Sequence, residues 1–307
     1  MSFDFNRAIW CGLTMDPIDT NEPGHNLPKR NCAVSEMSGV LEVVLRHDRA
    51  VVLAALAIIT ALAWADLVWL ADDMSMGGMD MDGFRMIPAG QGLMIPATAP
   101  WQPVEFAYVL AMWIVMMIGM MTPSVAPMIL IYARVGRQAA IDGQPFAAST
   151  WFASGYFIAW IAFSLAATSM QWVLERAALL TPMMESASSV LGAIVLIVAG
   201  IYQWTPLKEA CLSYCQAPLS FIMRHGGFRA DPAGAVALGF RHGLYCIGCC
   251  WSLMLLLFVG GIMNLFWIAA LAVLVLVEKT LSSGNLISRL AGLGFIAAGC
   301  LLLLSQR

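Results

Sequence analysis

Charged residues are scarce in this chain of 307 amino acids. Only 11% of the residues are Asp, Glu, Lys or Arg, whereas 60% are hydrophobic, and the mean hydropathy is +0.78. A soluble domain of this length needs far more polar side chains on its surface. The net charge of −3 comes without any basic patch interleaved with aromatic residues, which argues against nucleic-acid binding. The composition is that of a membrane protein.

The usual signs of hydrolytic catalysis are also missing. The sequence has no nucleophile grouped with a base, no glycine-rich phosphate loop and no convincing pair of carboxylates. These absences lean against an enzyme without excluding one, so we look for ligand binding instead.

Long apolar runs predict an all-α fold, a polytopic bundle of about seven transmembrane helices. The runs cover approximately residues 50–71, 106–132, 151–174, 187–207, 233–260, 262–277 and 286–306. We expect residues 1–49 to form a cytoplasmic, largely disordered tail and residues 50–307 to form the transmembrane domain. Met37 is an alternative start to Met1.

Lys and Arg are distributed unevenly between the two sets of loops. Most of them fall on the side of the N-terminus, whereas Arg85, Arg176 and Arg307 fall on the other side. Because positively charged loops stay in the cytoplasm, the N-terminus is predicted to be cytoplasmic and the C-terminus to face outward. The expected location is the bacterial inner membrane.

The longest outward loop, residues 72–105, is rich in methionine and aspartate. Thioether sulfur is soft and neutral and therefore suits Cu(I), and the aspartates attract cations. The loop either collects copper or is a flexible segment that packs on the membrane surface. The candidate ligands in it are Met74, Met76, Met79 and Met81.

A second group of methionines lies in the predicted helix over 106–132. Met116 and Met120 are four residues apart and share one face, with Met117 and Met121 beside them. These methionines either fill irregular helix contacts or pass an ion along the span. Pro123 follows directly after Thr122, and proline predicts a kink or break there, which is where membrane transporters often bind ions.

Cysteines gather at the predicted cytoplasmic ends of two spans. Cys211 and Cys215, in "KEACLSYCQAP", are spaced to share one helical face. In "HGLYCIGCCW" the same spacing relates His242 to Cys246, with Cys249 and Cys250 flanking that face. Asp231 and Pro232 predict the start of this helix, and Gly239 and Gly243 predict close approach by another helix.

Three interpretations of these cysteines compete. They bind a soft metal, copper or zinc; they form a redox pair, since Cys246 and Cys249 make a C-x-x-C; or they are small buried hydrophobes. A reducing cytoplasm keeps thiols available to metals and weakens the redox interpretation. We favour the metal.

Three stretches of the chain, "MWIVMMIGMMTP", "IYQWTPLKEACLSYCQAP" and "GLYCIGCCWSLMLLLFVGGIMNLFWIAALAVLVLVEK", resemble the domain of unknown function 2182 family over residues 100–280. The resemblance implies a metal-binding integral membrane protein, and a small companion protein as partner. Gln216 departs from the arginine expected after the second cysteine. The positions that the resemblance carries over are Met116, Met117, Met120, Met121, Pro123, Lys208, Cys211, Cys215, Cys246, Cys249, Cys250, Trp251, Asn264 and Glu278.

These patterns predict an integral membrane protein that binds Cu(I), or another soft metal, and transports it or hands it on. Thioethers outside and thiolates inside form a gradient of rising affinity, which favours inward delivery. The alternatives are a membrane thiol–disulfide oxidoreductase and a non-transporting assembly factor for a partner complex.

Overall fold

The computed structural model describes residues 33–75, 84–88, 94–96, 99–143, 146–180 and 188–305. The chain divides into two units, Met1–Val44 and Leu45–Arg307; the described part of the first is helical, and every element after the first helix belongs to the second. In chain order the elements are α1 (Ala33–Ser75), β1 (Phe84–Met86), β2 (Met94–Pro96), α2 (Pro103–Ile141), α3 (Ser149–Arg176), α4 (Ser189–Tyr202), α5 (Pro206–Gln216), α6 (Pro218–Arg224), α7 (Pro232–Leu255), α8 (Leu257–Gly260), α9 (Leu265–Thr280) and α10 (Gly284–Leu304).

The predicted all-α transmembrane bundle is confirmed, with fewer spans than expected. Within the described residues, five helices are long and apolar enough to cross a membrane, and α4 with α5 makes a sixth if this pair, bent by 65°, is one span. The apolar run at 262–277 forms α9, whose 16 residues reach only about 24 Å, less than the roughly 30 Å of a bilayer core. The remaining apolar runs coincide with helices, although α1 begins at Ala33, inside the predicted tail.

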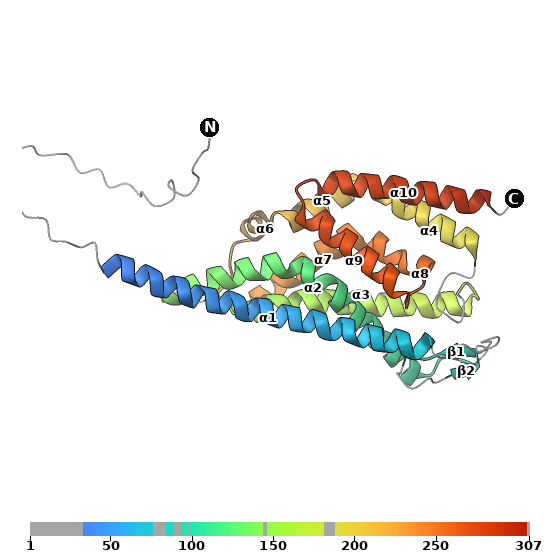
Figure 1. Cartoon of the computed structure of the whole chain (residues 1–307), viewed down its shortest axis with the longest axis horizontal. Helices are drawn as coiled ribbons and strands as arrows, with labels where there is room; N and C mark the ends of the chain where they lie inside the picture. The colour runs from blue at the N-terminus through green and yellow to red at the C-terminus, as the bar shows by residue number, and fades with distance from the viewer. Residues whose placement is uncertain are drawn as a thin grey trace, which may run out of the picture. The chain divides into compact units, whose positions relative to one another are not determined.

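Figure 1 shows how the helices pair: α3 runs along α7, and α4 runs along α10. The α3–α7 pair is close because glycines face the opposite backbone. A Cβ added to Gly239 would lie 1.9 Å from the carbonyl oxygen of Phe152, and one added to Gly155 would lie 2.0 Å from that of Val236. The close approach predicted at Gly239 is confirmed.

Helix α2 continues through Pro123, so of the predicted kink or break at this proline the break is wrong, and the kink stays a prediction. Proline has no N–H and leaves the carbonyl four residues earlier, that of Gly119, without its helical donor. The indole nitrogen of Trp64 on α1 donates to this oxygen at 3.3 Å. A neighbouring helix thus replaces the missing hydrogen bond, as membrane helices with proline require.

The interruption lies instead between α4 and α5. Thr205 caps α5 by accepting a hydrogen bond from the Lys208 amide at 3.3 Å, and Pro206 occupies the first turn. Proline is well tolerated there because the first amides of a helix have no helical acceptor. The bend sets α5, with Cys211 and Cys215, at an angle to α4. Asp231 caps α7 in the same way, as predicted.

Candidate metal-binding site

Four thiols from two helical segments come together at the cytoplasmic side predicted from the sequence. Cys246, Cys249 and Cys250 on α7 are buried, and Cys215 on α5 is half-buried. The thiol of Cys215 interacts with those of Cys246 and Cys249. We call these four residues the thiol cluster. Its Cys215 is the member with the largest exposed fraction.

Two thiols of the cluster are held by the backbone of α7. Cys249 Sγ donates to the carbonyl oxygen of Cys246 at 3.0 Å, and Cys250 Sγ donates to the same oxygen at 2.9 Å. Both protons therefore point at one helical carbonyl, and neither thiol is free to turn without breaking that contact. Cys246 makes no such bond, so its sulfur is the one whose partners are side chains.

Cys211 lies beside the cluster. Its Sγ would be 2.8 Å from a Cβ added to Gly248, so the sulfur packs directly on the backbone of α7. It also interacts with the thiol of Cys249. Cys300, by contrast, is exposed on α10.

Two buried polar side chains contact the sulfur of Cys246. The ammonium of Lys279 on α9 donates to it at 2.8 Å, and the hydroxyl of Tyr156 on α3 lies 3.1 Å away. Lys279 also donates to Ser124 Oγ on α2 at 3.3 Å. Helices α2, α3 and α9 thus all supply groups to one cysteine of α7.

His242 is buried one helical turn before Cys246, among aromatic rings. Its ring centroid lies 5.0 Å from that of Phe221, 5.9 Å from that of Tyr156 and 6.0 Å from that of Phe152. Among the residues that the structure describes, its Nδ1 has no hydrogen-bond partner. The aromatic rings fix the imidazole next to the thiol cluster while one of its nitrogens stays available.

The predicted methionine stripe is fully buried and leads toward this site. Met116, Met117, Met120 and Met121 are each at most 1% exposed. The hydroxyl of Tyr156, which contacts Cys246, also lies 3.5 Å from the carbonyl oxygen of Met121. One tyrosine therefore separates the end of the stripe from the thiol cluster. Met76, Met79 and Met81 and the side chain of Met74 lie outside the described residues.

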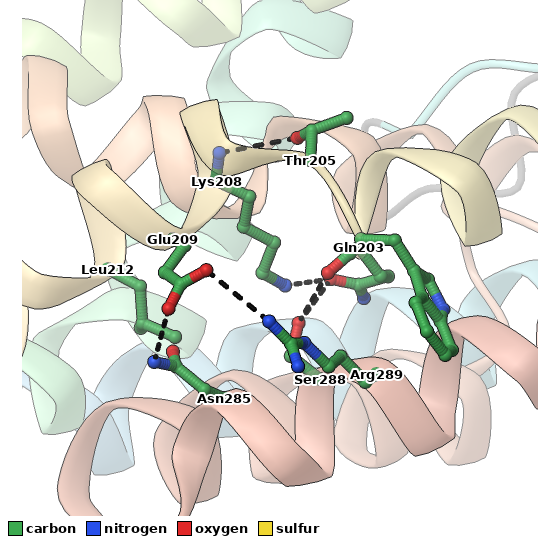
Figure 2. A pocket seen from close by; sticks show the side chains of 9 residues that line it. Gln203, Thr205, Lys208, Glu209, Leu212, Asn285, Ser288 and Arg289 are labelled. Atoms are coloured by element: carbon green, nitrogen blue, oxygen red, sulfur yellow. Dashed lines mark hydrogen bonds and ion pairs between the residues drawn. The ribbon is translucent and has the colours of Figure 1, made fainter.

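A second polar network ties α5 in place. Lys208 Nζ lies 2.8 Å from Glu278 Oε2 and also donates to Gln203 Oε1. Ser288 Oγ donates to that same amide oxygen at 2.9 Å. Figure 2 shows the side chains of Lys208, Gln203 and Ser288 converging from α5, the α4–α5 bend and α10 around a small polar pocket. Gln216 Nε2, at the end of α5, donates to the carbonyl oxygen of Glu278 at 2.7 Å.

The sequence analysis missed two groups that contact Cys246, those of Lys279 and Tyr156. It also did not identify Lys208 as the partner of Glu278. The adjacent charges Glu278 and Lys279 end an apolar run, where charged side chains usually lie at the membrane interface, yet both are buried. Tyr156 gave no signal at all. Among the residues that the structure describes, no three His, Cys, Asp or Glu side chains form a ready-made metal-binding group. Metal binding by the predicted residues thus remains a prediction.

Comparison with known proteins adds one finding. A family model described as PpoB2, copper chaperone, matches residues 110–302, more than half of the chain. This range includes the methionine stripe, the thiol cluster, Tyr156 and Lys279. The match supports a copper-related family, in agreement with the predicted binding of a soft metal, but it does not support the name of the domain of unknown function 2182 family. Neither a curated protein nor a solved structure matches the chain.

Proposed function

Because the chain belongs to the PpoB2 copper chaperone family, we propose that it binds Cu(I) as its cargo within the membrane and transports it or hands it on. The observation that carries this proposal is the gathering of four thiols from α5 and α7 next to a buried methionine stripe. Thiolate and thioether sulfurs are the ligands that select Cu(I) over harder ions.

The chemistry of the thiol cluster suits a cargo of low coordination number. Zn(II) in a structural site takes four ligands in a tetrahedron, whereas Cu(I) is commonly satisfied by two sulfurs. Cys215 and Cys246 come from different segments, and neither thiol donates to the Cys246 carbonyl that holds Cys249 and Cys250. We propose these two as the primary ligands, with Cys211, His242, Cys249 and Cys250 as further ligands.

Binding is then a simple exchange. Cys246 binds as the thiolate that the ammonium of Lys279 stabilises, the S–H bond of Cys215 breaks and its proton leaves for the aqueous phase, and two Cu–S bonds form, while copper stays Cu(I) and no electron moves. Release to an acceptor reverses these steps through thiols of that acceptor, which replace Cys215 and Cys246 one at a time. The half-buried position of Cys215 favours it as the sulfur at which exchange begins.

The route proposed for the ion starts at the outer loop. Met74, Met76, Met79 and Met81 collect the ion, and the stripe of α2 passes it to the side of Tyr156. Neutral thioethers bind more weakly than thiolates, so the ion moves toward the cysteines. With the N-terminus in the cytoplasm of a bacterium, this direction is inward, and a small companion protein is a suitable acceptor.

The test is metal quantification on the purified full chain after loading with Cu(I). We expect the wild-type protein to retain copper and the Cys246→Ser variant to lose most of it. Cys300→Ser is the matched control, because Cys300 is exposed on α10 outside the thiol cluster, and it should retain copper like the wild type. Absence of copper above background in the wild-type protein overturns the proposal.

One observation favours a second candidate, a thiol–disulfide oxidoreductase. The ammonium of Lys279 beside Cys246 is the kind of group that activates a thiol for exchange with Cys249. Such enzymes in membranes need their thiols on the oxidising side. We therefore expect a membrane-impermeant maleimide to leave Cys211 and Cys215 unlabelled in intact cells and to label them in inverted vesicles. The opposite pattern favours the oxidoreductase.

A non-transporting assembly factor uses the same ligands. It differs in giving copper-dependent co-purification with one partner and no metal flux into vesicles that contain the protein. Flux into such vesicles favours transport.

A further inference from the structure

Two lysines are buried near the bend between α4 and α5, and their partners differ. Lys208 is 1% exposed and forms an ion pair with Glu278 at 2.8 Å. Lys279 is 6% exposed, and its ammonium lies 2.8 Å from Cys246 Sγ and 3.3 Å from Ser124 Oγ. Within the described residues, no ion pair joins Lys279 to a carboxylate.

A buried ammonium without a carboxylate is costly, since removing a charge from water is repaid only by a close opposite charge. Glu278, the carboxylate next in sequence, is already engaged by Lys208. The thiol cluster is therefore the source of negative charge that faces Lys279. Among the residues that the structure describes, its ammonium also donates to the neutral hydroxyl of Ser124, and the neutral hydroxyl of Tyr156 lies against the same sulfur.

We propose that Lys279 makes the thiol cluster selective for a monovalent soft ion, Cu(I) or Ag(I), over a divalent one such as Zn(II), by cancelling the charge of a two-thiolate complex. This inference rests on the proposed function, since it concerns the same cysteines. Lys279 contacts the cargo's ligand and not the cargo, so it is a positioning and selectivity residue.

The selectivity follows from counting charges. Two thiolates and one monovalent ion carry −1, which the ammonium of Lys279 brings to zero. Two thiolates and a divalent ion are already neutral, so the ammonium is left uncompensated in the core. With Lys279 beside it, a divalent complex reaches overall neutrality only by adding a third thiolate, and Cys249 or Cys250 must first give up its hydrogen bond to the Cys246 carbonyl.

The test measures affinities for Cu(I), Ag(I) and Zn(II) by competition with chromophoric chelators on the full chain in lipid nanodiscs. Lys279→Met should weaken Cu(I) and Ag(I) binding by about 100-fold, the effect of removing one member of a buried charge pair, and should not weaken Zn(II) binding. Lys279→Arg keeps the charge and should keep the preference for monovalent ions. Arg289→Ala is the control, because it removes an exposed positive charge whose partner is Glu209 and should leave the Cu(I)-to-Zn(II) ratio unchanged.

A second variant tests the same idea without removing the lysine, in case Lys279→Met does not fold. Ser124→Asp places a carboxylate next to the ammonium and offers it a competing partner, so the Cu(I)-to-Zn(II) ratio should fall as in Lys279→Met. Ser124→Ala should leave that ratio at the wild-type value.

The outcomes separate the inference from the function on which it rests. A wild-type protein that binds neither Cu(I) nor Ag(I) overturns the proposed function. If the wild type binds Cu(I), Cys246→Ser does not, and both Lys279→Met and Ser124→Asp keep the wild-type ratio, the role of Lys279 is wrong while the proposed function stands. A ratio that falls in both variants and survives in Lys279→Arg supports the inference.

Discussion

Lys208 Nζ and Glu278 Oε2 lie 2.8 Å apart in the core and join α5 to α9. Lys208→Met leaves the carboxylate buried without its partner, so we expect it to lower the free energy of unfolding by about 3–5 kcal/mol. Thermal or denaturant unfolding of the protein in detergent measures this loss.

The control for this prediction is the other ion pair that α5 makes. Arg289 and Glu209 are 3.5 Å apart, and both side chains are about half exposed. Arg289→Ala should therefore change stability by about 1 kcal/mol or less. Equal stability of the two variants would show that the buried pair does not hold α5.

Gly239 is the position in the α3–α7 contact with the least space for an added side chain. A methyl group there would meet the carbonyl oxygen of Phe152 at 1.9 Å, and backbone cannot turn aside as a side chain does. We expect Gly239→Ala to destabilise the protein by about 3 kcal/mol or more and to separate Tyr156 on α3 from Cys246 on α7.

Gly294→Ala is the matched substitution on α10, where nothing lies within 4 Å of the added carbon. It should be neutral or slightly stabilising, since alanine is the better helix former. The melting temperatures of the two variants test this prediction. If Gly239→Ala melts at the same temperature as Gly294→Ala, the close α3–α7 contact described here is wrong.

The methionine stripe can be tested without disturbing the fold. The double variant Met120→Leu, Met121→Leu replaces both thioethers with hydrocarbon of similar volume, so each change should cost less than about 1.5 kcal/mol. Copper bound to protein isolated from copper-limited cells should fall roughly tenfold, the equivalent of about 1.4 kcal/mol in ion transfer. Copper bound after direct loading of the purified protein should be unchanged.

Met170→Leu controls for the loss of a methionine outside the stripe. Met170 belongs to α3 and lines a separate cavity whose lining side chains are apolar. Copper content in the cell should stay at the wild-type level. If the stripe variant binds as much copper in cells as Met170→Leu does, the stripe is not part of the route.

Much of the fold is local and could be predicted. The length of the apolar runs identified the helices. Asp231 and Pro232 identified the start of α7, because a capping side chain and a proline affect only the helical turn in which they lie. The continuity of α2 could not be predicted, because the donor that rescues the carbonyl of Gly119 is Trp64, 55 residues earlier.

The candidate site divides in a similar way. Helical spacing within a segment indicated that Cys246, Cys249 and Cys250 belong together. The meeting of α5 with α7, and the contact of Lys279 with Cys246 across 33 residues of sequence, depend on how the helices are rotated about their axes. A single sequence contains no direct signal for that rotation.

The adjacency of Glu278 and Lys279 has a mechanical consequence. Successive residues of a helix point about 100° apart, so the last turn of α9 reaches α5 through Glu278 and α7 through Lys279. Any rotation of that turn moves both contacts at once. The end of α9 thus links the two segments that carry the thiols, so a displacement of this turn moves both parts of the thiol cluster together.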